Sequence, residues 1–353
     1  MSVKFTLLGC GSSMGIPRID GSFGNCDPKN KKNLRSRCSA LISTKNNNII
    51  IDTSPDVRSQ LIKNKINNIE CVFYTHHHAD QTHGINELRY FYIKRNKQIP
   101  VYADKQTKKY LIKSFKYCFK NGKDYPATLK LNNLKKKHIF NFEQKKIQIE
   151  SFKVKHGLIN SVGYIINKKC AYISDVSHVF KKDLIKLSNL NYFVIDCLRY
   201  KKHPSHFNLD DVLSIPAIHP VSMNDCKVTS KYGKRLHPTL KKYHMHAGQD
   251  FAPISNFWDT EIYATANGKI KKSVYLPDTY GHYIEIDHGN GLVTAYAHLR
   301  VRNVRKGQKV KRGQKIGIMG STGMSTSVHL HYEVKKNGKA VNPDQYFFDQ
   351  KSL

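Results

Sequence analysis

The sequence has few acidic residues for its size. Its 353 residues contain 26 Asp and Glu against 59 Lys and Arg, which gives a formal net charge of +33 at pH 7. A surplus of this size suits a polyanionic partner such as nucleic acid or cell-wall material. A general bias toward lysine, asparagine and isoleucine accounts for it equally well, because lysine runs such as residues 135–137 are usually solvated faces. The charge by itself therefore selects no function.

Long apolar runs and a secretion signal are also missing. No stretch of about 18 apolar residues exists, so we expect no membrane span. The apolar run within residues 1–9 is too short for a signal peptide and has no cleavage pattern. We therefore expect a cytoplasmic protein, which would reach the cell envelope only by another export route.

The cysteines do not form a disulfide or zinc-ribbon pattern. There are eight, and no two are spaced as CxxC. Several lie within apolar segments that we expect to be strands, namely Cys71, Cys170 and Cys197. This placement predicts buried, reduced thiols.

The length is enough for two domains of ordinary size, although no Gly/Ser-rich linker separates them. The first part mixes hairpin strands with helices, for example a helix within Asp56–Asn67. The later part has short strands with glycine turns about every ten residues, which indicates an all-β domain. We predict an α+β protein with domains at 1–213 and 217–353. The strands expected in the second domain are 227–232, 261–266, 268–275, 283–288 and 292–298.

A dense group of potential metal ligands follows a buried strand in the first domain. The apolar strand Cys71–Tyr74 runs directly into a polar segment. In that segment His76, His78 and Asp80 alternate, and a helix is expected next, over Ile85–Arg95. Imidazole and carboxylate ligands this close together after an apolar strand are typical of a two-metal hydrolytic site. The alternative, a solvent-exposed polar loop, does not explain the strand and helix on either side.

Six segments of the first domain carry a family resemblance. They are Gly9–Ser13, Ile51–Asp56, His76–Asp80, Lys155–Gly157, Tyr172–Asp175 and His203–His206. With these segments, residues 1 to about 212 resemble the metallo-β-lactamase fold, an αββα sandwich. The resemblance is strongest to its phosphodiesterase branch, the phosphoribosyl cyclic phosphodiesterases, and extends to the tRNA-processing ribonuclease Z enzymes.

This resemblance implies a di-zinc hydrolase that acts on a cyclic phosphate or RNA. One of His203 and His206 would assist proton transfer near the scissile phosphate, and a hydroxide between the two ions would be the nucleophile. The implied zinc ligands are His76, His78 and His156 for one ion, Asp80 for the second, and Asp175 as the bridge.

Two departures from the family concern the second zinc ion. The family has a histidine directly after the aspartate of its motif, where this sequence has Gln81, and His83 lies close enough to be a substitute. Beyond His206 the family continues with a helix, a strand and a final histidine ligand. This sequence passes into different material after Asp210–Pro216. We therefore expect an incomplete sandwich that binds up to two zinc ions.

The second domain contains a His-x-His pair in an apolar, aromatic run. The alternation predicts a strand in which His329 and His331 point to the same face. His246 and Asp250 lie four residues apart across a glycine. Together with one histidine of the pair they would bind tetrahedral zinc and leave one position open. His298 and the other histidine of the pair would then be neutral imidazoles for proton transfer, rather than surface histidines.

A second family resemblance rests on six segments of this domain. They are Ser230–Pro238, His246–Asp250, Tyr296–His298, Gly320–Gly323, His329–His331 and Val341–Pro343. Residues from about 217 to 347 thereby resemble the lysostaphin/LytM-type zinc endopeptidases that cut peptidoglycan cross-bridges. The resemblance assigns one zinc ion to three of these residues and catalysis to two others: His246, Asp250 and His331 for zinc, His298 and His329 for catalysis. One departure, Ser327–Val328 in place of Gly-Pro, removes no ligand.

These patterns predict a zinc metalloendopeptidase that acts on peptidoglycan peptides and is fused to a metallo-β-lactamase-like domain. Two other functions are kept beside it. One is a di-zinc phosphodiesterase acting on a cyclic phosphate or RNA through the first domain. The other is a non-catalytic basic protein that binds cell wall or nucleic acid. Peptidoglycan lies outside the cytoplasm, so the predicted activity and the predicted compartment disagree.

Overall fold

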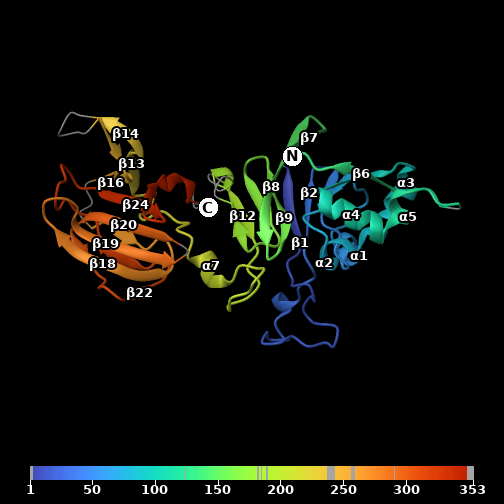
Figure 1. The fold of residues 1–353 in the computed structure, drawn as a ribbon, viewed down its shortest axis with the longest axis horizontal. Coiled ribbons are helices and arrows are strands. Elements are labelled where there is room, and N and C mark those ends of the chain that lie inside the picture. Colours follow the sequence, from blue (N-terminus) through green and yellow to red (C-terminus); the bar gives the residue numbers. More distant parts are fainter. Residues whose placement is uncertain are drawn as a thin grey trace. The chain divides into compact units, whose positions relative to one another are not determined.

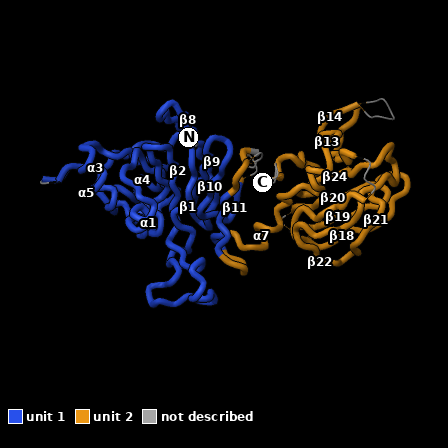
Figure 2. Tube along the Cα trace, turned by 180° about the vertical axis from the view of Figure 1, so that it is seen from behind, with its two compact units in different colours: residues 1–179, 194–198, 204–206 blue, residues 180–193, 199–203, 207–353 orange. Residues whose placement is uncertain are grey.

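The chain forms two compact units, which Figure 2 shows in different colours. The computed structural model describes residues 3–123, 125–180, 183, 185–187, 190–236, 243–255, 259–289 and 291–347. Unit 1 comprises residues 1–179, 194–198 and 204–206. Unit 2 comprises residues 180–193, 199–203 and 207–353. Each unit has its own sheets and its own apolar core, so each is described separately (Figure 1).

Unit 1 is built on two β-sheets. The first has the order β1-β2-β3-β4-β5-β6, antiparallel as far as β3 and parallel beyond it. The second has the order β11-β8-β9-β10-β12, with β7 beside β8. The strand bounds are β1 (Lys4–Gly9), β2 (Ser39–Ser43), β3 (Asn48–Ile51), β4 (Cys71–Phe73), β5 (Ile99–Ala103), β6 (Leu129–Asn133), β7 (Lys137–Phe142), β8 (Lys145–His156), β9 (Ile159–Ile166), β10 (Cys170–Ile173), β11 (His178–Val179) and β12 (Tyr192–Ile195).

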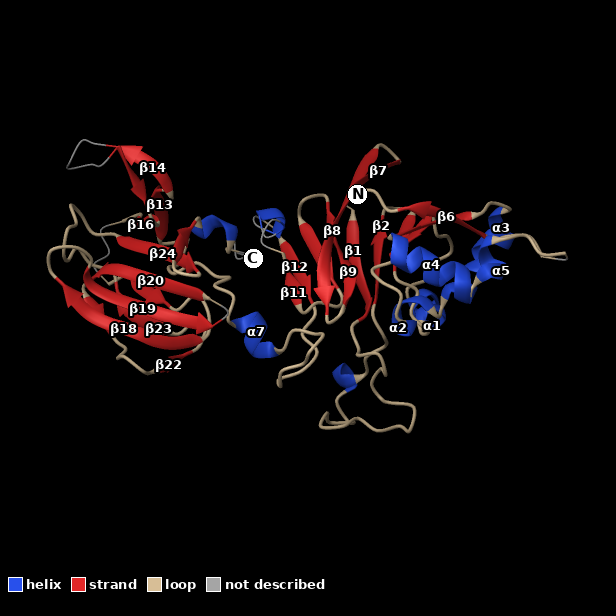
Figure 3. Ribbon diagram, in the orientation of Figure 1, coloured by secondary structure: helices blue, strands red, loops and turns tan. Residues whose placement is uncertain are grey.

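Helices cover one face of the first sheet, and the second sheet covers the other (Figure 3). The alternation along β3 produces this layering, because successive side chains of a strand point to opposite faces. Ile50 packs with Val57 and Leu61 of the helical layer, whereas Ile49 and Ile51 pack against strands of the second sheet. The helical elements of unit 1 are η1 (Lys31–Asn33), α1 (Val57–Lys63), α2 (Ala79–Thr82), η2 (Ile85–Leu88), α3 (Arg89–Arg95), α4 (Lys105–Ser114) and α5 (Lys116–Phe119).

The cysteine prediction is right for the strands and wrong for one loop. Cys71 in β4 and Cys170 in β10 are buried free thiols, as their apolar neighbours indicate. Cys197 is exposed, because β12 ends two residues before it and the chain continues as a loop. A short apolar run therefore predicted the strand correctly but not where the strand ends.

Unit 2 is dominated by one antiparallel sheet of order β13-β16-β24-β20-β19-β18-β22, with β25 beside β24. A hairpin of β14 and β15 and a small sheet of order β17-β23-β21 complete it. The elements are η3 (Ile185–Leu187), α7 (Leu209–Leu213), β13 (Cys226–Ser230), β14 (Gly233–Leu236), β15 (Tyr243–His246), β16 (Gln249–Pro253), β17 (Glu261–Tyr263), β18 (Gly268–Leu276), β19 (Gly281–Gly289), β20 (Leu292–Leu299), β21 (Val301–Arg302), β22 (Lys309–Val310), β23 (Lys315–Ile318), β24 (Leu330–Lys336), β25 (Lys339–Val341) and η4 (Pro343–Gln345).

All five strands predicted for the second domain are present, with ends that differ by a few residues. The apolar faces of the unit 2 strands form one core, in which Phe251, Tyr296 and Tyr332 are fully buried. The α+β class is confirmed, with a mixed unit followed by a β-rich one. No helix among the described residues is long and apolar enough to cross a membrane.

Candidate metal centres

In unit 2 three side chains from three strands converge on one point. His246 ends β15, and the pairing of β16 with β24 places Asp250 directly opposite His331. His246 Nε2 is 3.0 Å from Asp250 Oδ1 and 3.1 Å from His331 Nδ1, and the latter two atoms are 2.8 Å apart. Ligand atoms about 2 Å from a tetrahedral zinc ion stand about 3.3 Å from one another. The three side chains therefore fit the ion.

The charge of this trio is also that of a cation site. Burial alone would raise the pKa of Asp250, but hydrogen bonds from His246 and His331 outweigh it and hold that pKa well below its usual range. Burial would lower the pKa of His331, yet Asp250 and Glu333 raise it to about 9. The carboxylates thus keep a positive charge on the imidazole. A zinc ion bound to the trio would replace that proton.

A carboxylate holds the far side of His331. His331 Nε2 donates to Glu333 Oε1 over 3.1 Å, which leaves Nδ1 for the metal. Glu333 also accepts from the Tyr280 hydroxyl at 3.0 Å and pairs with Lys335 at 3.0 Å. Such a partner fixes the ring orientation of a metal-bound histidine and raises its basicity. Sequence reasoning missed Glu333, although it continues the alternation of His329 and His331.

The other two ligands are held in the same way. His246 Nδ1 donates to the carbonyl of Lys231 over 2.8 Å. Arg235 Nη2 lies 3.2 Å from Asp250 Oδ2, the oxygen that faces away from the two histidines. Each predicted ligand therefore has one atom for the ion and one atom tied to the protein. Arg235 lay within a segment that carries the resemblance but was given no role. His237 and Pro238 of that segment lie outside the described residues.

The two predicted catalytic histidines stand beside the trio. The ring centroids of His298 and His329 are 4.8 Å apart, and His298 is 6.1 Å from His331. His298 Nδ1 donates to the Thr322 carbonyl over 2.8 Å, and His329 Nδ1 donates to the Ser327 carbonyl over 2.8 Å. Burial lowers the pKa of His298 to about 4, so this imidazole is neutral near pH 7 with Nε2 unprotonated.

A cavity of about 760 Å³ joins these residues. His246, Asp250, His298, His329 and His331 all contribute to its lining. His298 sits in the left-handed region with φ of +63°, a conformation that non-glycine residues adopt at a cost and that is common at functional sites. The structure thus brings together every site residue predicted for the second domain.

In unit 1 three histidines converge in a similar manner. His76 follows β4, His78 precedes α2, and His156 is the last residue of β8. His78 Nδ1 is 3.1 Å from His76 Nε2 and 3.3 Å from His156 Nε2. His156 Nδ1 donates to the Ser205 carbonyl over 2.7 Å, so Nε2 is its free nitrogen. These distances fit a metal ion bound by three imidazoles.

Two buried residues fix the position of His76. Thr75 Oγ1 is 3.1 Å from His76 Nδ1 and donates to Asp52 Oδ2 over 2.8 Å. The second oxygen of Asp52 accepts from the Thr75 backbone N–H over 2.8 Å. Asp52 is fully buried and has φ of +60°. Asp52 lies in the segment Ile51–Asp56 that carries the family resemblance, but only the structure reveals this support.

Asp175 lies next to the three histidines. With His156 and His206 it forms a second group of potential ligands, which shares His156 with the first. His206 Nδ1 is 2.6 Å from Asp196 Oδ2 and 3.7 Å from Asp175 Oδ1. Burial, followed by the neighbouring charge of Asp196, raises the pKa of Asp175 to about 7. Sequence reasoning missed Asp196, because no local pattern distinguishes it from other strand-end carboxylates.

Three of the named residues are not brought into either group. Among the residues that the structure describes, no cluster of potential metal ligands includes Asp80, His83 or His203. His83 instead packs edge-on against Phe115, with ring centroids 5.3 Å apart. His203 is half-buried in a loop after β12. The roles predicted for Asp80 and His203 stay predictions.

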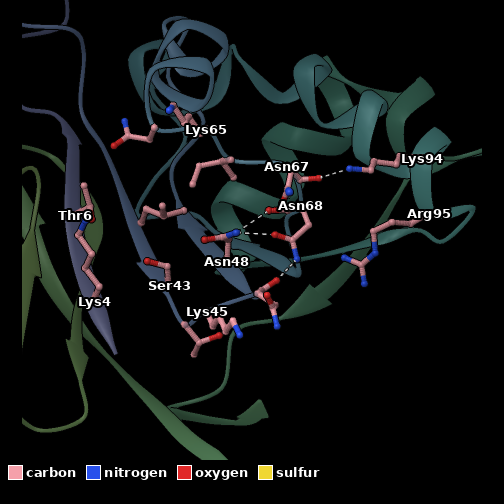
Figure 4. A pocket seen from close by; sticks show the side chains of 15 residues that line it. Lys4, Thr6, Ser43, Lys45, Asn48, Lys65, Asn67, Asn68, Lys94 and Arg95 are labelled. Carbon is pink, nitrogen blue, oxygen red and sulfur yellow. Dashed lines mark hydrogen bonds between the residues drawn. The ribbon is translucent and has the colours of Figure 1, made fainter. Parts of the chain in front are cut away.

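A separate cavity of unit 1, of about 500 Å³, has a different character (Figure 4). Its lining includes Lys4, Lys45, Lys65 and Lys94, together with several asparagines, and contains no His, Cys, Asp or Glu. Asparagine contacts dominate it, for example Asn48 Nδ2 to an oxygen of its neighbour Asn68 over 2.6 Å. The lining therefore offers cations and amides, without the imidazole and carboxylate groups of the two metal centres.

Two family models match the chain, over separate ranges of residues. Residues 47–218 match the model "Beta-lactamase superfamily domain", and residues 244–343 match "Peptidase family M23". These matches confirm both predicted resemblances. The chain therefore carries a β-lactamase superfamily domain followed by an M23 peptidase domain.

Several known proteins are similar to parts of this chain. Peptidoglycan DD-endopeptidase ShyA of Vibrio cholerae is 44% identical over 110 residues, which are 31% of this chain and 24% of that protein. An octanoyltransferase of Porphyromonas gingivalis is 29% identical over 213 residues, 60% of this chain and 42% of that protein. A solved diphosphatase from the PhnP family has a TM-score of 0.53 and 28% identity, over 61% of this chain and 81% of that one. The chain spans less than half the length of these curated relatives.

Proposed function

We propose that unit 2 is a zinc metalloendopeptidase that binds one zinc ion and cleaves peptide bonds of peptidoglycan. The observation that carries the proposal is the convergence of His246, Asp250 and His331, with the three ligand atoms 2.8 to 3.1 Å apart. The substrate class is supported by the 44% identity to a peptidoglycan DD-endopeptidase over 110 residues.

The mechanism follows from the two neighbouring histidines. Zinc bound to the trio supplies a Lewis acid for the scissile carbonyl and for the attacking water. His298 and His329 are tied through Nδ1 to backbone carbonyls, so each can present an unprotonated Nε2 to the cavity. One of the two histidines accepts a proton from the attacking water. The imidazolium that results stabilises the negative charge on the carbonyl oxygen and then gives its proton to the leaving amine.

The test separates zinc binding from proton transfer. Purified His331→Ala should lose the zinc ion of unit 2 and release no muropeptides from peptidoglycan. His329→Ala should keep its zinc but release muropeptides about 10² to 10⁴-fold more slowly, because it lacks only a proton-transfer group. Zinc is measured by elemental mass spectrometry and release by chromatography of the soluble products.

His282→Ala is the matched control. His282 lies in the same sheet but outside the cavity, and its ring packs on Tyr275. This variant should retain both zinc and activity. If His331→Ala released muropeptides at the rate of the wild-type protein, the proposal would be contradicted.

We propose a second activity, phosphodiester hydrolysis, for unit 1. It is supported by the trio of His76, His78 and His156 and by the similarity to a diphosphatase from the PhnP family. The expected substrate is a cyclic phosphate or RNA. Asp175 and His206, 3.7 Å apart beside the trio, are the groups available for proton transfer.

This activity can be assayed with bis(p-nitrophenyl) phosphate and added zinc or manganese. Turnover should disappear in His78→Ala and persist in His83→Ala, because His83 lies on the same segment but outside the trio. Absence of turnover by the wild-type protein with every metal tested would count against the proposal.

A further inference from the structure

The side chain of Gln81 lies between two carboxylates of unit 1. Gln81 is fully buried in α2, directly after Asp80. Its Nε2 atom is 3.2 Å from Asp80 Oδ2 and 3.1 Å from Asp175 Oδ2. A primary amide has two N–H donors, so one amide nitrogen can donate to both carboxylates. The amide thus lies where the resemblance puts a second metal ion, between its Asp80 ligand and its Asp175 bridge.

The acceptors fix the orientation of this amide. With both carboxylates ionised, a turned-over amide would place Oε1 at hydrogen-bond distance from two carboxylate oxygens, and the three acceptors would repel one another. In the observed orientation Oε1 is buried and has no hydrogen-bond partner, which is itself costly. The two bonds made by Nε2 therefore outweigh that cost. The two N–H groups stabilise the carboxylate oxygens, a role that a cation would otherwise fill.

The surrounding residues offer too few atoms for two ions. Within the described part of the chain, Asp80 belongs to no cluster of three or more potential ligands. The two clusters of unit 1 share His156, whose Nδ1 is used by the Ser205 carbonyl. Only its Nε2 remains, and one nitrogen atom binds one ion. The two clusters therefore cannot both hold an ion at the same time, and together they provide one metal position.

We propose that unit 1 binds one metal ion, on His76, His78 and His156, and that the Gln81 amide takes the place of a second ion. Asp80 is then a hydrogen-bond acceptor and not a ligand. A phosphodiester in this unit would meet one Lewis acid and no two-metal clamp. The inference does not depend on the peptidase activity of unit 2.

The number of zinc ions per full-length chain tests this directly. The protein is incubated with excess zinc, desalted, and measured by elemental mass spectrometry. We expect two ions in the wild type, one in each unit. Asp80→Asn should keep both, because an asparagine oxygen still accepts from Gln81. His78→Ala should lose one. A wild-type count of three, or the loss of one ion in Asp80→Asn, would overturn the inference.

Failure of this inference and failure of the peptidase proposal give different results. If unit 2 binds no zinc, the wild type holds one ion and His331→Ala loses none, but Asp80→Asn still leaves the count unchanged. If unit 1 binds none, His331→Ala holds no ion, which also overturns the single-ion site. Should His78→Ala fail to fold, the wild-type count and Asp80→Asn still decide the question, since Asp80→Asn retains the shape and the hydrogen bond.

Discussion

At the residue scale, the site of unit 2 depends on atoms that face away from the ion. His331 can offer Nδ1 to zinc because Glu333 accepts the proton on Nε2 over 3.1 Å. Glu333 is almost fully buried, and hydrogen bonds from His331 together with the charges of His331 and Lys335 outweigh its burial and lower its pKa to about 2. It is therefore a carboxylate at any pH at which the protein would work. Its role is to position a ligand, since it does not itself join the trio.

Glu333→Gln should weaken zinc binding while the fold is retained. The amide keeps the shape of the side chain but loses the charge that orients His331 and raises its basicity. Loss of such a partner typically costs 10-fold to 100-fold in metal affinity. The dissociation constant, measured by competition with a chromophoric chelator, should rise by that factor, and activity should recover when zinc is added in excess.

Glu285→Gln provides the comparison. Glu285 is also buried and lies in the same sheet, but its ion-pair partners are Lys271 and Lys272. Its replacement should leave zinc affinity unchanged. Equal losses of zinc affinity in the two variants would mean that Glu333 acts only through the general charge of the sheet.

At the scale of elements, the pairing of β19 with β20 contains a buried histidine that serves structure alone. His288 Nδ1 donates to the Asn267 carbonyl over 2.7 Å, and Nε2 accepts from the Thr294 hydroxyl over 2.7 Å. Acceptance from Thr294 requires an unprotonated Nε2, so the ring in this arrangement is neutral. Burial lowers the pKa of His288 to about 4, against about 6.5 in an unfolded chain. His288 therefore makes the stability of unit 2 depend on pH.

The sign of this dependence follows from proton uptake. Between pH 6.5 and 4 the unfolded chain binds a proton at His288 and the folded chain does not, so acid favours unfolding. The contribution of His288 to the free energy of unfolding is fully present above pH 6.5. It falls by up to about 3 kcal/mol as the pH drops to 4. In urea titrations His288→Gln should be less stable than the wild type at pH 7, with the gap closing toward pH 4. Parallel curves would contradict this account.

At the scale of the whole molecule, one chain carries two sites built on the same principle. In each site three ligand atoms lie within 4.8 Å of one another and come from two segments distant in the sequence. They differ in their neighbouring groups, because unit 1 adds two carboxylates bridged by an amide, whereas unit 2 adds two imidazoles. Because the amide of unit 1 takes the place of a second ion, we expect one metal ion in each unit and two per chain.

Local patterns predicted much of the fold and most of the candidate site. The five strands of the later domain were correct because alternation and glycine turns are local signals. The ligand types were evident because histidines and aspartates were grouped within short segments. Residues that support the site from elsewhere, such as Asp52 and Asp196, were missed because their function depends on contacts made only in the folded chain.

The sequence by itself determined which side chains are available and which face of a strand they share. His329, His331 and Glu333 follow one another at every second position, and this spacing persists in any strand. Only the tertiary structure decided how segments combine. The register of β16 against β24 brings Asp250 to His331, and packing brings Asp175 to Gln81 across 94 positions. Strand spacing is a property of the local backbone, whereas register and packing depend on the whole core.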